Sequence, residues 1–492
     1  MRETHTAVLF FVGDRAYKLK KRVDLGFVDY TTRTARRDAC EQEVALNRRF
    51  APDVYLGVGE FHSPDAEMPE PLVVMRRMPA ERRLSRLVGE GVDVDEVLRA
   101  VARLLAARHA EAAHGPEIDE QGTRGSLSSR WADSFAQVRA LAADGPVPDG
   151  VEEVERLVHR YLAGREPLFD ARIQQGRVVD GHGDLLAEDI FCLDDGPRVL
   201  DCLEFDDRLR YVDGLDDAAF LAMDLEQLGA PDAAAFFLTR YSEYSGDTAP
   251  PSLWHHYVAY RAFVRAKVSL IQARQGAPGA AAASQRLVST TLRHLRASVV
   301  GLTLVGGLPG SGKSTLSGAL ADRLGVTLLS SDRLRKELAG IPPEEAAAAR
   351  YGEGLYTPER TATTYAALLS RAFALLSRGE SVVLDATWSD ARQREAAVDM
   401  AERAHADLVA LHCQAPNEVS AARLTARAAG ASDADLDVAT AMAAIEPPWT
   451  EAVGIDTGGS LETAVAQALA AVRPHSPDDR ASTFRRSHME PD

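Results

Sequence analysis

The sequence predicts two domains of different fold class, an α+β domain followed by an α/β domain with a parallel sheet flanked by helices. The chain has 492 residues, which is too many for one hydrophobic core. Its first half opens with short strand patterns and continues into long helical patterns. After Val299 the chain instead reads as a buried strand, a glycine-rich loop and a helix. We place the domains at residues 1–298 and 299–472, and expect residues 473–492, rich in Pro, Ser, Arg and Asp, to form a disordered tail.

Composition limits the classes of partner. Hydrophobic residues make up 46% of the chain and charged residues 26%, as in ordinary soluble proteins. The net charge of -17 disfavours nucleic acids and anionic membranes as partners. The 4 cysteines form no C-x-x-C pair, and the sequence contains neither a signal-like apolar segment at its start nor a run long enough to cross a bilayer. We therefore expect a cytoplasmic protein with reduced thiols.

The first half begins with the pattern of a β-hairpin. Residues 6–12 and 16–21 alternate like strands, and Gly13-Asp14 forms the turn between them. A charged helical stretch follows at residues 37–50, and a further apolar strand at residues 72–75. Residues 92–165 are rich in Ala, Leu and Arg and predict several helices.

Acidic residues gather in the segment from Val178 to Asp206. His182-Gly183-Asp184 is predicted to lie in a loop, and Asp189 follows shortly after it. A predicted hairpin then ends near Asp201, so that the three aspartates come to neighbouring loop ends. Phosphoryl transfer needs a carboxylate that accepts a hydroxyl proton beside oxygen ligands for Mg²⁺. Because Asp also favours turns, the spacing alone leaves a structural and a catalytic interpretation about equally supported.

His182-Gly183-Asp184-Leu185, together with Asp189 and Val199-Leu200-Asp201, resembles the catalytic and metal loops of the aminoglycoside phosphotransferase family. That family shares the protein-kinase-like fold, and the resemblance covers most of residues 1–298. It implies that Asp184 is the catalytic base and that Asp189 and Asp201 are Mg²⁺ ligands, although the family usually has Asn at the position of Asp189.

The same resemblance assigns residues outside these loops. Lys18 matches the strand lysine that holds the ATP phosphates, and Glu43 matches its helix partner, with Glu41 as a rival. Residues 75–78 match the adenine-binding hinge, and Asp213 and Asp217 match an acidic pair with a structural role. The strand and glycine-rich loop that cover the nucleotide in the family are expected to be absent or shortened here. Phosphotransfer and a non-catalytic binding role both stay open for this half.

The strongest motif of the chain lies at its centre. Leu302 to Val305 predicts a buried strand, and Thr315 to Leu324 predicts a helix. Between them lies a complete G-x-x-x-x-G-K-S motif, Gly307-Leu308-Pro309-Gly310-Ser311-Gly312-Lys313-Ser314-Thr315. In this context the loop amides surround phosphates, the lysine reaches the β- and γ-phosphates, and the serine hydroxyl ligates Mg²⁺. The motif therefore predicts an ATP–Mg²⁺ site.

Three further features accompany the motif. Asp332, with Arg333 and Arg335, follows a predicted strand and can orient or deprotonate an acceptor hydroxyl; an N-cap role is the alternative. Asp385 ends another predicted strand and can hold Mg²⁺ through water. Arg423 and Arg427 share one helix face and can neutralise the transferring phosphate, although a solvated face is equally consistent with their spacing.

Residues 299–472 resemble the small P-loop kinases, a group that includes gluconate kinase, zeta-toxin-like kinases and polynucleotide 5′-hydroxyl kinases. The resemblance rests on the Gly307–Thr315 loop, Ser331-Asp332-x-x-Arg335, Leu384-Asp385-Ala386-Thr387 and Arg423-x-x-x-Arg427. Together the two halves predict an ATP-dependent phosphotransferase that uses Mg²⁺ and a small hydroxylated acceptor. The alternatives are a regulatory ATP-binding protein with a non-catalytic first half and a polynucleotide 5′-hydroxyl kinase. The sequence leaves the acceptor and the oligomeric state open.

Overall fold

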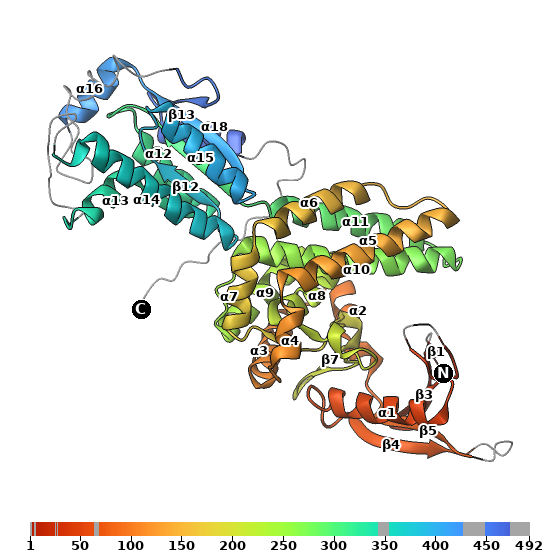
Figure 1. Ribbon diagram of the computed structural model, residues 1–492. Helices are drawn as coiled ribbons and strands as arrows, with labels where there is room; N and C mark the ends of the chain where they lie inside the picture. The colour runs from red at the N-terminus through yellow and green to blue at the C-terminus, as the bar shows by residue number, and fades with distance from the viewer. Residues whose placement is uncertain are drawn as a thin grey trace.

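The computed structural model describes residues 2–3, 6–24, 26, 28–62, 68–342, 354–426 and 448–472. An antiparallel sheet with helix α1 lies at one end of the molecule, a helical region forms the middle, and a parallel sheet with its own helices lies at the other end (Figure 1). The predicted fold class is therefore confirmed. The predicted tail at residues 473–492 and Arg427 lie outside the described residues.

The N-terminal sheet has five strands in the order β1-β2-β3-β5-β4. The predicted hairpin is confirmed, since β2 and β3 pair with Val12 opposite Arg15. A two-residue strand precedes it and pairs with β2. The sequence reading missed the fourth strand, which contains two glycines that weaken the strand pattern. The elements are β1 (Arg2–Glu3), β2 (Ala7–Val12), β3 (Arg15–Lys20), α1 (Arg33–Asn47), β4 (Tyr55–Phe61) and β5 (Glu70–Arg76).

The middle region is mainly helical, with two small two-stranded sheets beside the loops that carry the acidic cluster. Its helices are α2 (Leu84–Gly89), α3 (Asp95–Glu111), α4 (Pro116–Gln121), α5 (Arg124–Leu141), α6 (Val151–Ala163), α7 (Glu166–Gln174), α8 (Gly214–Gln227), α9 (Pro231–Ser245), α10 (Pro251–Arg274) and α11 (Ala280–Ala297). Its strands are β6 (Val178–Asp180), β7 (Ile190–Leu193), β8 (Gly196–Val199) and β9 (Tyr211–Asp213), and short 3₁₀ turns lie at Ala80–Arg82, Ala142–Asp144, Ala187–Asp189 and Asp207–Leu209.

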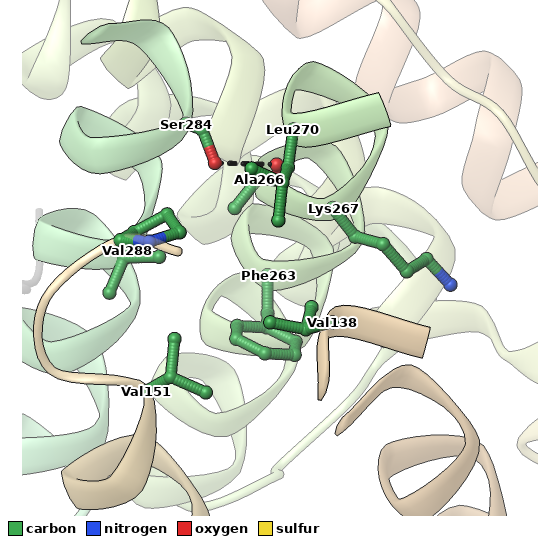
Figure 2. Close-up of a pocket in the computed structure, with 9 residues that line it drawn as sticks. Val138, Val151, Phe263, Ala266, Lys267, Leu270, Ser284 and Val288 are labelled. Atoms are coloured by element: carbon green, nitrogen blue, oxygen red, sulfur yellow. Dashed lines mark hydrogen bonds between the residues drawn. The ribbon is translucent and has the colours of Figure 1, made fainter. Parts of the chain in front are cut away.

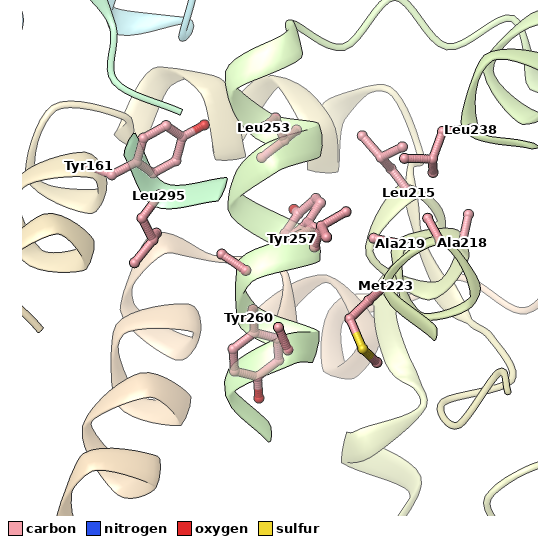
Figure 3. Close-up of a cluster of buried hydrophobic side chains, with 14 of the residues drawn as sticks. Tyr161, Leu215, Ala218, Ala219, Met223, Leu238, Leu253, Tyr257, Tyr260 and Leu295 are labelled. Atoms are coloured by element: carbon pink, nitrogen blue, oxygen red, sulfur yellow. The ribbon is translucent and has the colours of Figure 1, made fainter. Parts of the chain in front are cut away.

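Helix α10 is the central packing element of this region. Leu253 and Tyr257 on this helix are buried, and they lie between side chains of α8 on one side and Tyr161 and Leu295 on the other (Figure 3). Burying an aliphatic or aromatic side chain stabilises the fold by roughly 1.5–3 kcal/mol. Helix α10 therefore runs through the core, and it places its polar residues beside the loops described below.

The C-terminal sheet has five parallel strands in the order β11-β12-β10-β13-β14. Strand β10 is central and ends at the glycine-rich loop, and α12 follows that loop. The elements are β10 (Gly301–Gly306), α12 (Lys313–Leu324), β11 (Thr327–Ser330), α13 (Ser331–Leu338), a 3₁₀ turn at Gly354–Tyr356, α14 (Pro358–Ser377), β12 (Val382–Asp385), α15 (Ala391–Arg403), β13 (Asp407–Gln414), α16 (Asn417–Thr425), β14 (Val453–Asp456) and α18 (Leu461–Val472).

The alternative N-cap role for Asp332 is wrong. Helix α13 begins at Ser331, so its N-cap residue is Ser330 and Asp332 lies within its first turn. A carboxylate in the first turn still interacts favourably with the helix dipole. It is also placed at the carboxyl ends of the parallel strands, the edge at which α/β folds bind ligands.

The two halves are joined by buried polar contacts as well as by the chain. Ser252, at the start of α10, donates a 2.7 Å hydrogen bond to the carbonyl of Gly379, just after α14. Arg165 donates a 2.9 Å bond to the carbonyl of Ala404, after α15. Arg160 and Asp407 form an ion pair nearby. One hydrophobic cluster also includes residues from both halves.

An apolar crevice lies between α5, α10 and α11 (Figure 2). Phe263, Leu270 and Val288 line it, and Ser284 beside them donates a 2.8 Å hydrogen bond to the carbonyl of Ala266. The crevice contains none of the residues predicted to carry chemistry. Within the described part of the chain, no helix combines the length and hydrophobicity needed to cross a membrane.

Candidate active sites

Lys18, Glu43 and Asp201 meet in the N-terminal half. Nζ of Lys18 lies 2.8 Å from Oε1 of Glu43 and 2.7 Å from Oδ1 of Asp201. Lys18 points to the inner face of β3, and Glu43 faces it from α1. Glu41 is exposed and has only Arg37 near it, at 3.9 Å. The structure thus brings Glu43, and not its rival Glu41, to Lys18.

Glu43 contacts a second lysine that the sequence reading did not include. Lys20 lies two residues after Lys18 on the same face of β3, and its Nζ is 2.6 Å from Oε2 of Glu43. Lys20 also pairs with Glu204. Burial would raise the pKa of the Glu43 carboxyl, but the two lysines together lower it. The period-two spacing of the lysines was the signal that could have revealed this pair.

Two buried side chains fix the backbone that carries Asp201. The amide of Asp201 donates a 3.1 Å hydrogen bond to the hydroxyl of Tyr55, and the amide of Cys202 donates a 2.8 Å bond to Oδ1 of Asn47. Asp201 has a φ of 64°, a left-handed conformation that costs a non-glycine residue about 1–2 kcal/mol. These contacts hold a strained residue at the position predicted for metal binding. Asn47 lies one helical turn after Glu43, a spacing that could have been noticed in the sequence.

The loop that carries Asp184 is held from behind by Asp217. Oδ2 of Asp217 accepts a 2.7 Å hydrogen bond from the amide of His182, and Oδ1 accepts a 2.9 Å bond from the amide of Gly183. His109 contacts the same carboxylate at 3.1 Å. Asp213 forms a buried ion pair with Arg172 at 2.7 Å. The carboxylates of both aspartates therefore contact neighbouring protein groups rather than solvent.

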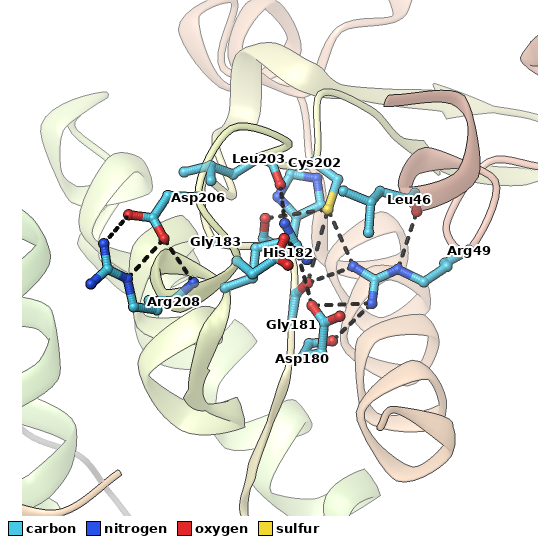
Figure 4. A network of polar contacts seen from close by, with 12 residues as sticks. Leu46, Arg49, Asp180, Gly181, His182, Gly183, Cys202, Leu203, Asp206 and Arg208 are labelled. Carbon is cyan, nitrogen blue, oxygen red and sulfur yellow. Dashed lines mark hydrogen bonds and ion pairs between the residues drawn. The ribbon is translucent and has the colours of Figure 1, made fainter. Parts of the chain in front are cut away.

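Arg49, two residues after α1, and Leu203 reinforce this loop (Figure 4). Arg49 donates hydrogen bonds of 3.0 Å and 2.8 Å to the carbonyls of Asp180 and Gly181. The amide of Leu203 donates a 3.1 Å bond to the carbonyl of His182. The segments around Asp184 and Asp201 are therefore directly hydrogen-bonded to each other.

Asp184 and Asp189 are half-buried, and their environment favours the protonated form. Burial raises the pKa of Asp184 to about 6, and the positive charge of Arg265 opposes this shift. Burial and the neighbouring charges of Asp201 and Asp184 raise the pKa of Asp189 well above its usual value. A pKa near 6 suits a group that must take up a proton close to neutral pH.

The glycine-rich loop has the backbone that its sequence requires. Gly307, Gly310 and Gly312 have φ values of 137°, 80° and 86°, which lie in the left-handed region that side chains disfavour. A Cβ atom on Gly307 would lie 2.8 Å from the carbonyl oxygen of Cys413, so the loop also packs too closely for a side chain there. Lys313 is buried at the start of α12, whereas Ser314 and Thr315 are exposed and Leu308 and Pro309 lie within the loop.

Four buried polar atoms around this loop have no hydrogen-bond partner among the residues that the structure describes. They are Oγ of Ser311, Oδ1 of Asp385, Nε of Arg335 and Nη1 of Arg423. Each unsatisfied buried group costs about 1–3 kcal/mol, and such groups are few in native proteins. Four of them around one loop indicate that the loop is built to surround a polar ligand.

Asp332, Arg335 and Asp385 lie at the carboxyl ends of neighbouring strands. Nη1 of Arg335 lies 2.8 Å from Oδ1 of Asp332, and the guanidinium stacks 4.6 Å from the ring centre of Tyr356. Burial raises the pKa of Asp385, an effect that Lys313 opposes and Asp332 reinforces. The structure therefore brings Lys313, Asp332, Arg335 and Asp385 together, whereas Arg333 is exposed.

Arg423 reaches the glycine-rich loop from α16. Its Nη2 donates a 2.7 Å hydrogen bond to the carbonyl of Thr457, whose hydroxyl donates a 2.6 Å bond to the carbonyl of Ser311. A Cβ atom on Gly312 would lie 3.2 Å from Nη1 of Arg423. The guanidinium is thus anchored through one nitrogen, and the other lies beside the loop. Arg427, its predicted partner, is outside the described residues.

The two sites differ in how they fit a divalent cation. Oδ1 of Asp385 is buried and unpaired, which fits a group that accepts from a metal-bound water. Asp201 has half of its side chain exposed and is oriented by Lys18. No group of three or more His, Cys, Asp or Glu side chains in the described ranges forms a complete metal site. Mg²⁺ commonly uses one or two carboxylates together with phosphate oxygens, so both places remain compatible with it.

A family model described as an AAA domain matches residues 302–448. An uncharacterized protein of Mycobacterium tuberculosis strain H37Rv is 43% identical over 468 residues, which covers 95% of this chain and 94% of that protein. An uncharacterized protein of Mycobacterium bovis matches with the same 43% identity and the same coverage of 95% and 94%.

Solved structures resemble each half separately. A choline kinase from Cryptosporidium parvum has 11% identity and a TM-score of 0.40, and the match covers 60% of this chain and 88% of that one. A gluconokinase from Sinorhizobium meliloti has 22% identity and a TM-score of 0.27, and the match covers 35% and 91%. An APS kinase from Mycobacterium tuberculosis, in complex with AMPPNP and APS, has 20% identity and a TM-score of 0.27, with coverage of 35% and 98%.

Proposed function

The chain belongs to the same family as the uncharacterized Mycobacterium proteins that match nearly its whole length, and from this premise we propose that it is an ATP-dependent phosphotransferase. The match covers both halves, so we propose this activity for the whole chain rather than for one half. Each half binds ATP with Mg²⁺, and a small hydroxylated molecule accepts the phosphate. The proposed domains are residues 1–298 and 299–472. The net charge of -17 supports a small acceptor over a polynucleotide.

The observation that carries this proposal is the set of unpaired buried atoms around the glycine-rich loop. Donors on Arg335 and Arg423 and acceptors on Ser311 and Asp385 lie beside the loop amides and Lys313. Donors of this kind suit phosphate oxygens, and a buried carboxylate oxygen suits a metal-bound water. A bound nucleotide with its cation would supply partners for both kinds of group, which no apolar or purely cationic ligand could do.

In the C-terminal half, the loop amides and Lys313 bind the β- and γ-phosphates. Ser314 and Asp385 hold Mg²⁺, which draws charge from the phosphate oxygens when it is bound. Asp332, oriented by Arg335, receives the acceptor hydroxyl, and Arg423 with Arg427 neutralises the charge of the transferring group. Phosphoryl transfer consists mainly of positioning and charge stabilisation, so this set of residues is sufficient for it.

In the N-terminal half, Lys18 binds the phosphates while Glu43 orients it. Asp184 takes the proton of the acceptor hydroxyl, and Asp189 with Asp201 holds Mg²⁺. The direct contacts of Lys18 with Glu43 and Asp201 support this assignment because they join the lysine to the metal loop. A half-buried Asp184 with a pKa near 6 supports its role as the proton acceptor.

A second candidate is that the N-terminal half senses a ligand and regulates the other half without catalysis. The buried hydrogen bonds of Ser252 with Gly379 and of Arg165 with Ala404 favour this candidate, because they connect elements of both halves. The substitution Asp184→Asn separates the two candidates. It abolishes phosphate transfer by the N-terminal half if that half is catalytic, and leaves all transfer intact if it is only a sensor.

The nucleotide stoichiometry of the full-length protein tests the main proposal. We expect calorimetry with AMP-PNP and Mg²⁺ to find two sites in the unaltered chain and one in each of the variants Lys313→Ala and Lys18→Ala. The control Lys267→Ala removes a lysine that lies outside both sites and should keep two. Unchanged nucleotide affinity and stoichiometry in Lys313→Ala would refute the proposed site in the C-terminal half. Labelled ATP and a panel of hydroxylated metabolites then show which half transfers phosphate.

A further inference from the structure

Five charged side chains form a connected chain of ion pairs on the inner side of the N-terminal sheet. Lys18 and Lys20 lie on the same face of β3, and Glu43 on α1 contacts both of them. Asp201 pairs with Lys18 at 2.7 Å, and Glu204, three residues later in the same loop, pairs with Lys20. Negative and positive charges therefore alternate from Asp201 to Glu204, and the loop is joined to β3 by two ion pairs.

These two ion pairs differ in exposure. In the outer pair, Lys18–Asp201, half of the Asp201 side chain is exposed. In the inner pair, Lys20–Glu204, the lysine side chain is 0% exposed and the glutamate side chain is 12% exposed. Nζ of Lys20 also lies 5.5 Å from the ring centre of Tyr30, which is itself buried. A phosphate or a metal ion can therefore reach the outer pair, whereas the ammonium group of the inner pair is closed to any ligand.

Glu43 depends on Lys20 for one of its two carboxylate oxygens. Oε1 lies 2.8 Å from Nζ of Lys18, and Oε2 lies 2.6 Å from Nζ of Lys20. Oε2 accepts no directed hydrogen bond from the described residues, so its contact with Lys20 is an ion pair in which charge attraction dominates. A buried carboxylate is stable only when neighbouring charges or donors compensate it. Lys20 provides this compensation, so Lys18 does not have to neutralise Glu43 alone.

The outer pair has to separate when ATP and Mg²⁺ bind as proposed for this half. Lys18 then interacts with the phosphates and Asp201 with the cation, so the loop loses its outer link to β3 when Asp201 must be held in place. The inner pair needs no such exchange, because its lysine is closed to ligands. Once Asp201 binds the cation, the two lysines also balance the charges of Glu43 and Glu204.

We propose that Lys20 is a positioning residue: paired with Glu43 and Glu204, it holds the loop of Asp201 against β3 while Lys18 and Asp201 exchange each other for the ATP phosphates and Mg²⁺. This inference rests on the proposed function of the N-terminal half and adds to it a residue that touches neither substrate nor metal. Without Lys20, the buried carboxylates of Glu43 and Glu204 would compete with the phosphates for Lys18. The loop would also lose its remaining ion pair with β3.

The test uses the full-length protein in the Lys313→Ala background, so that only the N-terminal site binds nucleotide. Glu204→Gln removes one charge with little change in shape and breaks only the inner pair. Lys20→Met removes the ammonium group from both of its carboxylate partners. The double variant Lys20→Met/Glu204→Gln removes both charges of the inner pair, and Glu43 keeps Lys18 as its partner.

Two measurements separate positioning from a purely structural role. Electron paramagnetic resonance follows the binding of Mn²⁺ in the presence of AMP-PNP. Hydrogen exchange with mass spectrometry follows the amides of residues 201–204, with and without AMP-PNP and Mg²⁺. The control Lys21→Met breaks the ion pair of Lys21 with Glu3, which lies next to the end of the same strand and is more exposed.

We expect Glu204→Gln and Lys20→Met each to lower the affinity for Mn²⁺ about tenfold or more, as for the loss of a group that orients a metal ligand. In Glu204→Gln the loop amides should exchange at the unaltered rate in the free protein, because the outer pair still holds them. With AMP-PNP and Mg²⁺ bound, they should exchange faster than in the unaltered chain. Lys21→Met should change neither the affinity nor the exchange.

The double variant distinguishes charge balance from positioning. It should be more stable than Lys20→Met alone, since fewer buried carboxylates are left without a partner, and thermal unfolding measures this recovery. If Lys20 positions the loop, the affinity for Mn²⁺ stays about tenfold lower although stability recovers. A role in charge balance alone would restore both.

The inference is overturned if Glu204→Gln keeps the unaltered affinity for Mn²⁺, or if its loop exchanges faster to the same extent in the free and the loaded protein. It is also overturned if the double variant regains affinity together with stability. Should Lys20→Met fail to fold, Glu204→Gln and the double variant decide the question.

Failure of the proposed function gives a different result. If the Lys313→Ala protein without further substitutions binds no AMP-PNP and Mn²⁺, both proposals for the N-terminal half are refuted. If it binds them but transfers phosphate to no acceptor, phosphotransfer by this half is refuted, while reduced metal affinity in Glu204→Gln still supports the positioning role of Lys20.

Discussion

Nζ of Lys18 lies 2.7 Å from Oδ1 of Asp201, a residue 183 positions further along the chain. Oε1 of Glu43 lies 2.8 Å from the same ammonium group. Side chains from β3, from α1 and from the loop after β8 therefore meet at Lys18. This junction connects the antiparallel sheet to the loop proposed to hold Mg²⁺.

Glu43→Gln should strongly destabilise the protein. Glu43 is fully buried and pairs with Lys18 and Lys20, so the substitution leaves two buried ammonium groups without their shared carboxylate. Removing one partner of a buried ion pair costs about 3–5 kcal/mol. The control Glu41→Gln affects an exposed residue and should change the free energy of unfolding by less than about 0.5 kcal/mol. Urea unfolding measures both, and equal losses would show that Glu43 has no special part in the fold.

Tyr55→Phe should weaken metal binding in the N-terminal half. The Tyr55 hydroxyl accepts from the amide of Asp201 and helps to hold its left-handed backbone. Loss of such a supporting contact lowers metal affinity about tenfold or more. We expect a Mn²⁺ titration followed by electron paramagnetic resonance, with AMP-PNP and in the Lys313→Ala background, to show this loss. Tyr244→Phe removes a hydroxyl that contacts the surface residues Arg103 and Arg99 and should have no effect. An equal affinity in both variants would contradict the role of Tyr55.

Arg423→Ala should weaken nucleotide binding in the C-terminal half. The substitution removes a guanidinium whose Nη1 is buried and next to Gly312, with no hydrogen-bond partner in the described part of the chain. We expect the affinity for AMP-PNP to fall about tenfold, as for the loss of one charged hydrogen bond. Fluorescence titration in the Lys18→Ala background measures this site alone. Arg378→Ala changes an exposed arginine after α14 and serves as the control. A similar affinity for both variants would leave Arg423 with a structural role only.

Gly379→Ala should loosen the junction between the halves. Gly379 has a φ of 84°, and a Cβ atom there would lie 2.6 Å from Oγ of Ser252 and 3.1 Å from Cγ of Pro250. Gly276 has the same φ of 84°, but no atom lies within 4 Å of its added Cβ. We expect Gly276→Ala to cost about 1 kcal/mol for its backbone alone, and Gly379→Ala about 2–4 kcal/mol because contact strain is added. If Gly379→Ala and Gly276→Ala have equal midpoints of thermal unfolding, the junction tolerates a side chain at position 379.

His256 should make the protein less stable in acid. Its ring is buried and stacks 4.4 Å from the ring centre of Tyr161, and neither nitrogen has a hydrogen-bond partner among the described residues. Burial lowers its pKa from 6.5 to about 3, so between these values only the unfolded state binds the proton. Stability is then complete above about pH 6.5 and decreases as the pH falls, by about 2 kcal/mol between pH 7 and pH 5.

His256→Phe should abolish this part of the pH dependence while retaining the aromatic stack. Urea unfolding at pH 7 and pH 5 measures the difference between the two free energies for each protein. His159→Phe, which changes an exposed histidine, should leave the difference unchanged. If His256→Phe loses as much stability in acid as the unaltered chain, His256 is not the responsible group.

The elements predicted best were those with strong local patterns. The hairpin of β2 and β3, helix α12 and the parallel strands β10 and β12 all lie within a few residues of their expected bounds. Strand β4 was missed because Gly57 and Gly59 interrupt its pattern, although its pairing with β5 overrides their weak strand preference. Helix α13 begins at Ser331, because Ser331 and Asp332 suit a first helical turn as well as a loop.

The sequence by itself determined the fold class and the glycine-rich loop, since periodicity and a contiguous nine-residue motif are local properties. Only the tertiary structure decided that Glu43 rather than Glu41 faces Lys18, and that Tyr55 and Asn47 hold the Asp201 loop. These relationships join residues far apart in the chain. Which residues come into contact depends on how sheets and helices pack, and residue spacing in the sequence does not indicate that packing.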